Sequence, residues 1–188
     1  MHCLGVLLAA GASRRFGPED KLLAPYRGAA LVCAAATPLL GAGCDAVLAI
    51  VSSMEVANVL PTEIEICRVA SGRPLADSFG MAVDLALEQR ASRLLICLGD
   101  MPNVTAALLR RLVTYDGSCA CRVGATLTPP MVLGSADYAT AKAGADGDRG
   151  ARQFLTALPS NALIDVDPVE VLDIDRPDDL PRRRNKKP

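Results

Sequence analysis

Apolar runs typical of strands alternate along this sequence with longer segments typical of helices, and this order limits the possible folds more than any other feature. The strand-like runs cover residues 3–8, 45–52, 64–69, 93–98, 163–166 and 169–174. The helix-like segments cover residues 30–40, 53–59, 75–90, 105–115, 136–143 and 149–158. The β–α–β–α order of the first half predicts a mostly parallel, Rossmann-like sheet with helices on both faces, which is a three-layer α/β/α fold. The second half is less regular, and we expect a loop around Pro129 and Pro130.

The bulk properties indicate one soluble globular domain. The chain has 188 residues, of which 51% are apolar and 22% are charged, so it can bury one good core and should not be disordered. The longest uncharged run, residues 28–44, contains Pro38 and several small residues, which argues against a membrane span. A net charge of −1 does not suggest a nucleic-acid partner. We expect a single domain over residues 1–181, followed by a basic tail over residues 182–188.

The cysteines and the single histidine limit the chemistry. Of the seven cysteines only Cys119 and Cys121 are close in sequence, and with no histidine nearby they make a weak metal site. Free thiols suit a reducing cytoplasm, where we expect the protein to work. His2 is the only histidine and lies at the terminus, so Ser–His and Cys–His catalysis have almost no candidate residues.

A loop rich in glycine and basic residues follows the first predicted strand. It contains Gly11, Ser13, Arg14, Arg15, Gly17 and Lys21. Glycine lets the backbone come close to a ligand, exposed N–H groups form an anion site, and arginine and lysine match phosphate oxygens. The loop therefore indicates a polyphosphate site, and a plain solvated loop is the alternative. It is not a Walker-type loop, because Leu22 follows Lys21, and it contains no G-x-G-x-x-G dinucleotide pattern.

Carboxylates follow two other predicted strands. Asp100 comes directly after the run 93–98, and Asp173 and Asp175 lie at the end of the run 169–174. Ligands of an open parallel sheet bind beyond the carboxyl ends of its strands, so these side chains should lie near the glycine loop. Because Mg²⁺ takes one or two carboxylates together with phosphate oxygens, we expect Mg²⁺ at Asp100 and Asp175, with Asp173 as the alternative second ligand. Ordinary turn chemistry is the competing explanation for Asp100.

The glycine loop resembles the signature L-A-A-G-x-S-x-R-(F/M)-G-…-K of the MobA-like NTP transferase family, which has the glycosyltransferase-A-like nucleotidyltransferase fold. The matching residues are Leu8, Ala9, Ala10, Gly11, Ser13, Arg15, Phe16, Gly17 and Lys21. One departure is that three residues separate Gly17 from Lys21, which is more than the common form has. The resemblance implies that the loop wraps the triphosphate of an NTP and that Asp100 and Asp175 hold the metal. It also implies a contact of Ser78 with the nucleotide, although Ser78 is equally typical of a helix cap.

A second resemblance indicates one branch of this family. Residues 147–152 read G-D-R-G-A-R and resemble the G-D-x-G-A-R element of molybdenum cofactor cytidylyltransferases. In physical terms this is a glycine turn that opens a helix, with Arg149 and Arg152 able to bind an anionic second substrate or to lie on the surface. Ala10, which replaces a glycine, also favours the cytidylyl over the guanylyl branch. Ala82 departs from the family, which commonly has glycine at that position.

Taken together, the resemblance implies an enzyme that moves CMP from CTP onto the phosphate of molybdopterin and releases pyrophosphate. Arg15, Lys21 and Asp100 would be catalytic, with Mg²⁺ as the cofactor. Alternatives of the same class use GTP or ATP, or another acceptor such as a sugar phosphate, an alcohol phosphate or a corrinoid. An alternative of another class is a non-catalytic protein that carries a pterin cofactor. The implied partners are small molecules and a transient contact with a molybdoenzyme or its chaperone, with neither nucleic acid nor membrane.

Overall fold

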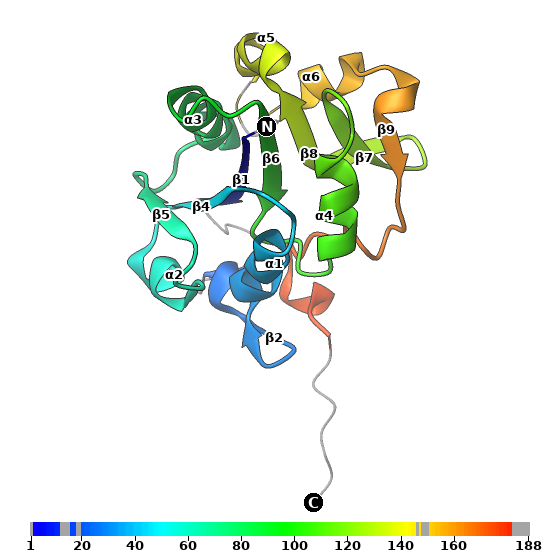
Figure 1. The fold of residues 1–188 in the computed structure, drawn as a ribbon. Coiled ribbons are helices and arrows are strands. Elements are labelled where there is room, and N and C mark those ends of the chain that lie inside the picture. The colour runs from blue at the N-terminus through cyan, green and yellow to red at the C-terminus, as the bar shows by residue number, and fades with distance from the viewer. Residues whose placement is uncertain (1, 12–15, 18–19, 146, 148–150, 182–188) are drawn as a thin grey trace, which may run out of the picture.

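The central feature of the structure, a computed structural model that describes residues 2–11, 16–17, 20–145, 147 and 151–181, is a seven-stranded sheet between two helical layers (Figure 1). Its strands are β1 (Cys3–Ala9), β4 (Ala46–Val51), β5 (Glu65–Arg68), β6 (Arg93–Leu98), β7 (Cys119–Val123), β8 (Thr126–Gly134) and β9 (Leu163–Asp165). They lie in the order β5-β4-β1-β6-β8-β7-β9. Strand β8 runs antiparallel to β6 and β7, and the other neighbouring pairs are parallel. The predicted mostly parallel α/β fold is therefore confirmed.

Helices cover both faces of the sheet. Helices α1 (Leu31–Leu40), α2 (Met54–Val59) and α4 (Ala106–Val113) pack on one face, and α3 (Leu75–Glu88), α5 (Tyr138–Ala143) and α6 (Arg152–Ala157) pack on the other. Strand β1 separates the two cores because successive side chains of a strand point to opposite faces. Leu7 and Ala9 belong to the core beneath α1, whereas Leu4, Val6 and Leu8 belong to the core beneath α3.

Two of the predicted helices begin at side-chain caps. The hydroxyl oxygen of Ser53 accepts a hydrogen bond from the backbone N–H of Val56 at 3.2 Å, at the start of α2. The hydroxyl oxygen of Thr105 accepts one from Leu108 at 3.1 Å, at the start of α4. Such a cap satisfies one of the N–H groups that the first turn leaves free. The predicted bounds therefore include the cap, and the helices themselves begin one residue later.

The loop predicted around Pro129 and Pro130 is wrong, because both prolines lie inside β8, and its partner β7 was not predicted at all. The register between β7 and β8 shifts between Ala120 and Cys121. The two prolines fall at this irregularity, and among the described strands neither is part of a pairing register. Proline lacks an N–H donor, so a sheet accommodates it at an irregularity of this kind.

The strand predicted over residues 169–174 is also wrong, because the chain turns there instead of joining the sheet. The carboxylate of Asp167 accepts a hydrogen bond from the N–H of Val169 at 2.8 Å. The backbone carbonyl of Asp167 accepts one from the N–H of Glu170 at 3.0 Å. A side chain that bonds to the backbone two residues on is a typical aspartate turn.

The other predicted elements of the second half are present with shifted bounds. The helix predicted over residues 136–143 is a 3-10 turn, η2 (Ser135–Asp137), that continues into α5. The helix predicted over residues 149–158 corresponds to α6, and residues 149–150 lie outside the described part of the chain, as does the tail over residues 182–188. No helix among the described residues is long and apolar enough to cross a membrane.

Candidate active site

Three charged side chains from distant parts of the sequence meet beyond the carboxyl ends of the parallel strands. The ammonium group of Lys21 donates to Oδ2 of Asp100 at 2.8 Å and to Oδ1 of Asp175 at 2.9 Å. Lys21 opens the short helix η1 (Lys21–Leu23), Asp100 follows β6, and Asp175 precedes η5 (Pro177–Asp179). The structure thus brings together the lysine of the glycine loop and the two carboxylates selected from the sequence.

The trio is partly shielded from water, which strengthens its electrostatic interactions. The side chains of Lys21, Asp100 and Asp175 are 12%, 21% and 39% exposed. Removal from water works to lower the pKa of Lys21, but the negative charges of Asp100 and Asp175 outweigh it and raise that pKa above its ordinary value. Lys21 is therefore a firmly protonated cation, and the trio carries two negative charges against one positive charge.

Lys21 is positioned by its immediate neighbours. The carboxylate of Asp20 accepts a hydrogen bond from the N–H of Leu22 at 3.0 Å and so caps η1. The side chain of Leu22 is 4% exposed and belongs to the core beneath α1. The backbone at Lys21 is therefore anchored on its C-terminal side, while the flexible lysine side chain reaches the carboxylates. Asp20 is not among the residues selected from the sequence, although aspartate is a typical residue at the start of a helix.

Asp100 is positioned by the glycine that precedes it. The N–H of Gly99 donates to the carbonyl of Leu8 at 2.9 Å, which ties the turn after β6 to the end of β1. A Cβ atom at position 99 would lie 3.1 Å from the Cβ of Ala9 and 3.4 Å from Cδ2 of Leu22. A Cβ contact of 3.1 Å is tighter than ordinary packing, so glycine at position 99 favours this close approach of the turn to the end of β1.

Asp175 is held beside Asp100 by the residue between it and Asp173. The N–H of Ile174 donates to the backbone carbonyl of Asp100 at 2.9 Å. The side chain of Ile174 is 1% exposed and packs with Tyr26 and Leu31 in a small separate core. The carboxylate of Asp179 also accepts a hydrogen bond from the N–H of Asp175 at 3.0 Å. These contacts fix the backbone on both sides of the Asp175 side chain.

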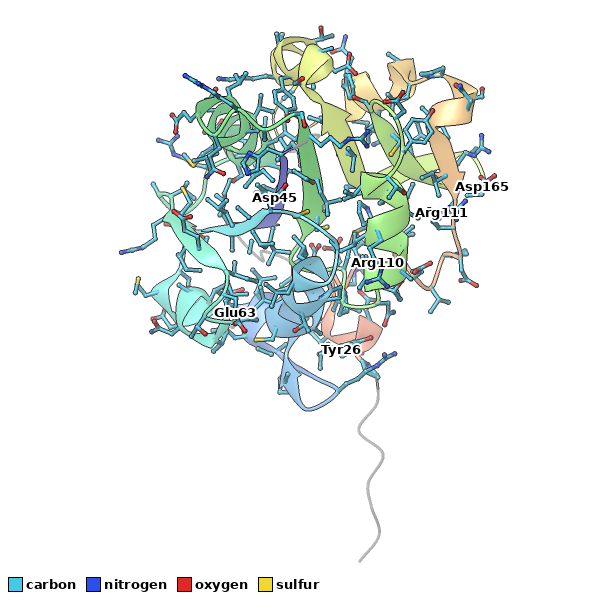
Figure 2. The ribbon with its side chains drawn as sticks, viewed as in Figure 1. Tyr26, Asp45, Glu63, Arg110, Arg111 and Asp165 are labelled. Carbon is cyan, nitrogen blue, oxygen red and sulfur yellow. The ribbon has the colours of Figure 1, made fainter. Side chains whose placement is uncertain are left out.

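Hydrogen bonds of side chains connect the C-terminal segment, residues 169–179, to the β6–α4 loop and to the small hairpin. The hydroxyl group of Tyr26, on the small hairpin of β2 (Pro25–Tyr26) and β3 (Ala29–Ala30), donates to Oδ1 of Asn103 at 2.7 Å. Figure 2 labels Tyr26 at this hairpin. The amide of Asn103 donates in turn to the carbonyl of Val169 at 2.9 Å. No local sequence pattern indicates these contacts, because each joins residues that are far apart in the chain.

Asp173, the alternative second ligand, lies near the trio without joining it. Among the described hydrogen bonds and ion pairs, it is Asp175 and not Asp173 that contacts Lys21. Because residues 169–174 do not form a strand, the alternation that would place the two aspartates on one face does not apply. Partial removal from water, followed by the charges of Asp100 and Asp175, raises the pKa of Asp173. Asp173 therefore adds to the negative potential around the site.

The described part of the glycine loop leaves open space where a ligand could approach. Leu8 and Ala9 end β1, and they and Ala10 are buried. Gly11 is exposed, and a Cβ atom added there would meet none of the described residues within 4 Å, so their packing does not require glycine at this position. Phe16 packs against the core of Tyr26, Leu31 and Ile174, which brings the far end of the loop near the C-terminal segment. Ser13, Arg14 and Arg15 lie outside the described residues.

The carboxylate pair fits a hard divalent cation. Oδ1 of Asp100 is buried and has no hydrogen-bond partner among the described residues, so within them one oxygen of the pair lacks a donor. Within the described ranges no group of three or more histidine, cysteine, aspartate or glutamate side chains is arranged to hold a metal. Two carboxylates alone suit Mg²⁺, which keeps several waters and takes its other ligands from substrate phosphates.

Among the described contacts, no hydrogen bond or ion pair joins Ser78 or Arg152 to the trio. Ser78 is 5% exposed and is not the cap of α3, because that position belongs to Pro74, so the helix-cap explanation is wrong. Arg152 is the exposed first residue of α6, and among the described contacts no hydrogen bond or ion pair connects it to Lys21, Asp100 or Asp175. Arg149 lies outside the described residues.

Comparisons with known proteins identify the family of this chain. The family described as MobA-like NTP transferase domain matches residues 5–162. A protein named nicotine blue oxidoreductase from Paenarthrobacter nicotinovorans is 31% identical over 168 residues, which cover 82% of this chain and 82% of that protein. A second relative, purine catabolism protein PucB from Bacillus subtilis (strain 168), is 29% identical over 202 residues, with 97% of each chain covered.

Solved structures of nucleotidyltransferase type share the fold. A nucleotidyl transferase from Methanothermobacter thermautotroptrophicus superposes with a TM-score of 0.81 at 23% identity, covering 93% of this chain and 92% of that one. The protein Rv0371C from Mycobacterium tuberculosis H37Rv, solved as a complex with manganese, superposes with a TM-score of 0.69 at 22% identity and covers 89% of each chain. With the family match spanning most of the sequence, the chain belongs to the MobA-like NTP transferase domain family.

Proposed function

We propose that the protein is a Mg²⁺-dependent nucleotidyltransferase that moves CMP from CTP onto the phosphate of molybdopterin and releases pyrophosphate. The observation that carries this proposal is the bridge that Lys21 makes between Asp100 and Asp175 at the end of a glycine loop. A transferase of this family needs a phosphate-binding cation and a metal-binding carboxylate pair close together, and these three residues supply both.

The chemistry requires little from the protein beyond position and charge. An oxygen of the acceptor phosphate forms a bond to the α-phosphorus of the nucleotide while the bond from that phosphorus to the β-phosphate breaks, and pyrophosphate leaves. A phosphate monoester is already an anion at neutral pH, so no general base is needed. Holding the two substrates in line can supply about 7–11 kcal/mol of the barrier reduction. The scarcity of histidine in this chain is consistent with such a reaction.

Each predicted residue has a role in this scheme. The nucleotide would contact Leu8, Ala9, Ala10, Gly11, Ser13, Arg15, Lys21, Ser78 and Asp100. Arg15 and Lys21 would stabilise the negative charge that develops on the leaving pyrophosphate. Arg149 and Arg152 would bind the anionic second substrate. The open space above Gly11 supports the loop assignment, because a phosphate could approach the backbone there.

Asp100 and Asp175 would hold the metal ion. A bound Mg²⁺ would polarise the phosphate oxygens and neutralise part of their charge. The buried oxygen of Asp100 that lacks a partner supports this assignment. The manganese complex of the M. tuberculosis neighbour supports the use of a divalent cation in this fold.

The choice of CTP and molybdopterin rests on Ala10 and on the element over residues 147–152. It is tested by comparing the rates with different nucleotides and acceptors. The protein is incubated with Mg²⁺, molybdopterin and CTP, GTP or ATP, and pyrophosphate release is measured. A parallel panel replaces molybdopterin with a sugar phosphate, an alcohol phosphate or a corrinoid. We expect the fastest release with CTP and molybdopterin. Faster release with another pair would replace these substrates, and no release with any pair would contradict the transferase assignment.

A second candidate function is that of a non-catalytic carrier of a pterin cofactor in the cytoplasm, acting through contact with a molybdoenzyme or its chaperone. One relative is named as an oxidoreductase and not as a transferase, so similarity to it does not by itself assign nucleotidyl transfer to this chain. A carrier has no need for a lysine and two carboxylates around one point. Binding of molybdopterin with no Mg²⁺-dependent pyrophosphate release would support the carrier.

A further inference from the structure

We propose that Lys21 takes the place of the divalent metal between Asp100 and Asp175 until a nucleotide arrives, so that the metal binds together with the nucleotide and not before it. This inference rests on the proposed function and adds an order of binding to it. It also assigns Lys21 a second task, because the residue that contacts the triphosphate would also control access to the metal ligands.

The geometry places one cation at the point of convergence of the carboxylates. The Lys21 nitrogen lies 2.8 Å from Oδ2 of Asp100 and 2.9 Å from Oδ1 of Asp175. The distance between these two oxygens therefore cannot exceed the sum of the two contact distances. A divalent cation bound by both oxygens would need the space that the ammonium occupies. The two cations would also repel each other in a region partly shielded from water. Lys21 and the metal therefore compete for this position.

Lys21 has an alternative site at hand when a nucleotide binds. Its backbone is anchored through the cap from Asp20 and the buried side chain of Leu22, so only the lysine side chain needs to move. That side chain is a flexible four-carbon stem with a compact charge. A triphosphate in the adjacent glycine loop carries more negative charge than the carboxylate pair and would attract the ammonium group. Its departure would open the position between the two carboxylates to the metal.

Lys21 is also an incomplete substitute for a metal. It satisfies one oxygen of Asp100, whereas Oδ1 of the same carboxylate is buried and has no partner in the described part of the chain. A metal ion with its bound waters offers more contacts than one ammonium group, so it would complete what Lys21 leaves unsatisfied once the ammonium has moved. Nucleotide and metal should therefore strengthen each other's binding, because each favours the same displaced position of Lys21.

The test is a titration of the full chain with Mn²⁺, in which electron paramagnetic resonance measures the free ion. Without nucleotide, we expect Lys21→Met to bind Mn²⁺ about tenfold or more tightly than the wild type. The matched control is Lys142→Met, which removes a lysine paired with Asp84 on α3 at 2.6 Å and away from the site, and which should leave the Mn²⁺ affinity unchanged. Affinity of Lys21→Met equal to or weaker than that of the wild type would overturn the inference.

A measurement on the wild type alone covers the case in which Lys21→Met does not fold. Addition of CTP should strengthen Mn²⁺ binding about fivefold or more beyond the binding of Mn²⁺ to CTP in solution, and no strengthening would overturn the inference. These titrations distinguish a failure of the binding order from a failure of the proposed function. Mn²⁺ binding that is tight without nucleotide, with normal pyrophosphate release, removes only the order of binding. No Mn²⁺ binding by any protein sample, even with CTP, removes the metal site and the proposed function as well.

Discussion

At the scale of single residues, the ammonium group of Lys21 offsets part of the negative charge that two carboxylates bring to a partly shielded position. Asp100 and Asp175 share one ammonium group, and Asp173 lies close enough for its pKa to be raised by their charges. Such an acidic cluster would be unfavourable without a cation, and it becomes favourable when a cation is bound. A site of this kind is suited to hold a metal during turnover and a lysine between turnovers.

The first prediction ranks the three aspartates. Asp100→Asn and Asp175→Asn should each lower kcat for pyrophosphate release by about a hundredfold or more, because each removes a charge at the point of convergence. Asp173→Asn, the matched control, should lower it by much less, since Asp173 does not contact Lys21. Steady-state kinetics with saturating Mg²⁺ measure these effects, and thermal unfolding checks that each variant is folded. An active Asp100→Asn enzyme, or a larger loss in Asp173→Asn, would contradict the assignment.

At the scale of elements, the turns that follow the strands position the site, and two glycines in them have different physical roles. A Cβ atom at Gly99 would come within 3.1 Å of the Cβ of Ala9, whereas one at Gly11 would meet none of the described residues within 4 Å. Gly99→Ala should destabilise the fold by about 1–3 kcal/mol, because the neighbours must move to admit a methyl group. Gly11→Ala should change stability by less than about 0.5 kcal/mol and yet raise the KM for the nucleotide. Denaturant unfolding and initial rates distinguish them, and a normal KM in a stable Gly11→Ala protein would argue against phosphate binding at that loop.

A fully buried apolar side chain, Ile174, anchors the C-terminal segment beside Asp100. Ile174 anchors it to Tyr26 and Leu31, and its N–H bonds to Asp100. Ile174→Ala should cost about 2–5 kcal/mol and release Asp175 from Asp100, so activity should fall more than in Ile174→Val, which costs about 0.5–1.5 kcal/mol. Chemical denaturation gives the free energy of unfolding, and pyrophosphate release gives the activity. Full activity in a folded Ile174→Ala protein would show that Asp175 is not needed beside Asp100.

At the scale of the whole molecule, the sheet brings together residues that are 154 positions apart in sequence. Strands β1 and β6 are neighbours, so the loop after β1 and the turn after β6 meet at one edge of the sheet (Figure 1). The C-terminal segment lies against the β6–α4 loop, to which it is joined by the hydrogen bond between Asn103 and Val169. Because Lys21 supplies a positive charge when no metal is present, removal of metal should leave the fold intact. We expect the unfolding temperature with EDTA to match that with Mg²⁺ within about 1 °C in the absence of nucleotide, since a ligand stabilises only as far as it binds. A large loss of stability with EDTA would show that the metal occupies its site before the nucleotide.

The parts of this arrangement that follow local rules could be predicted from the sequence. The apolar runs of β1 and β6 predict that the loop leading to Lys21 and the turn with Asp100 lie at the carboxyl ends of two strands, because strand length and burial are encoded in contiguous residues. The contacts that involve distant residues could not be predicted. The irregularity that admits Pro129 into β8 depends on the register with β7, and the turn at Asp167 depends on one side-chain hydrogen bond that overrides the apolar pattern of residues 169–174.

The central claim is that the glycine loop, Asp100 and Asp175 surround one nucleotide and one metal ion. The most direct test is a crystal structure of the protein grown with CTP and Mn²⁺, with the metal located by its anomalous scattering. We predict one Mn²⁺ peak between Asp100 and Asp175, with the triphosphate in the loop and the Lys21 ammonium moved onto its phosphate oxygens. Nucleotide and Mn²⁺ bound elsewhere, with Lys21 still bridging the two aspartates, would contradict the account.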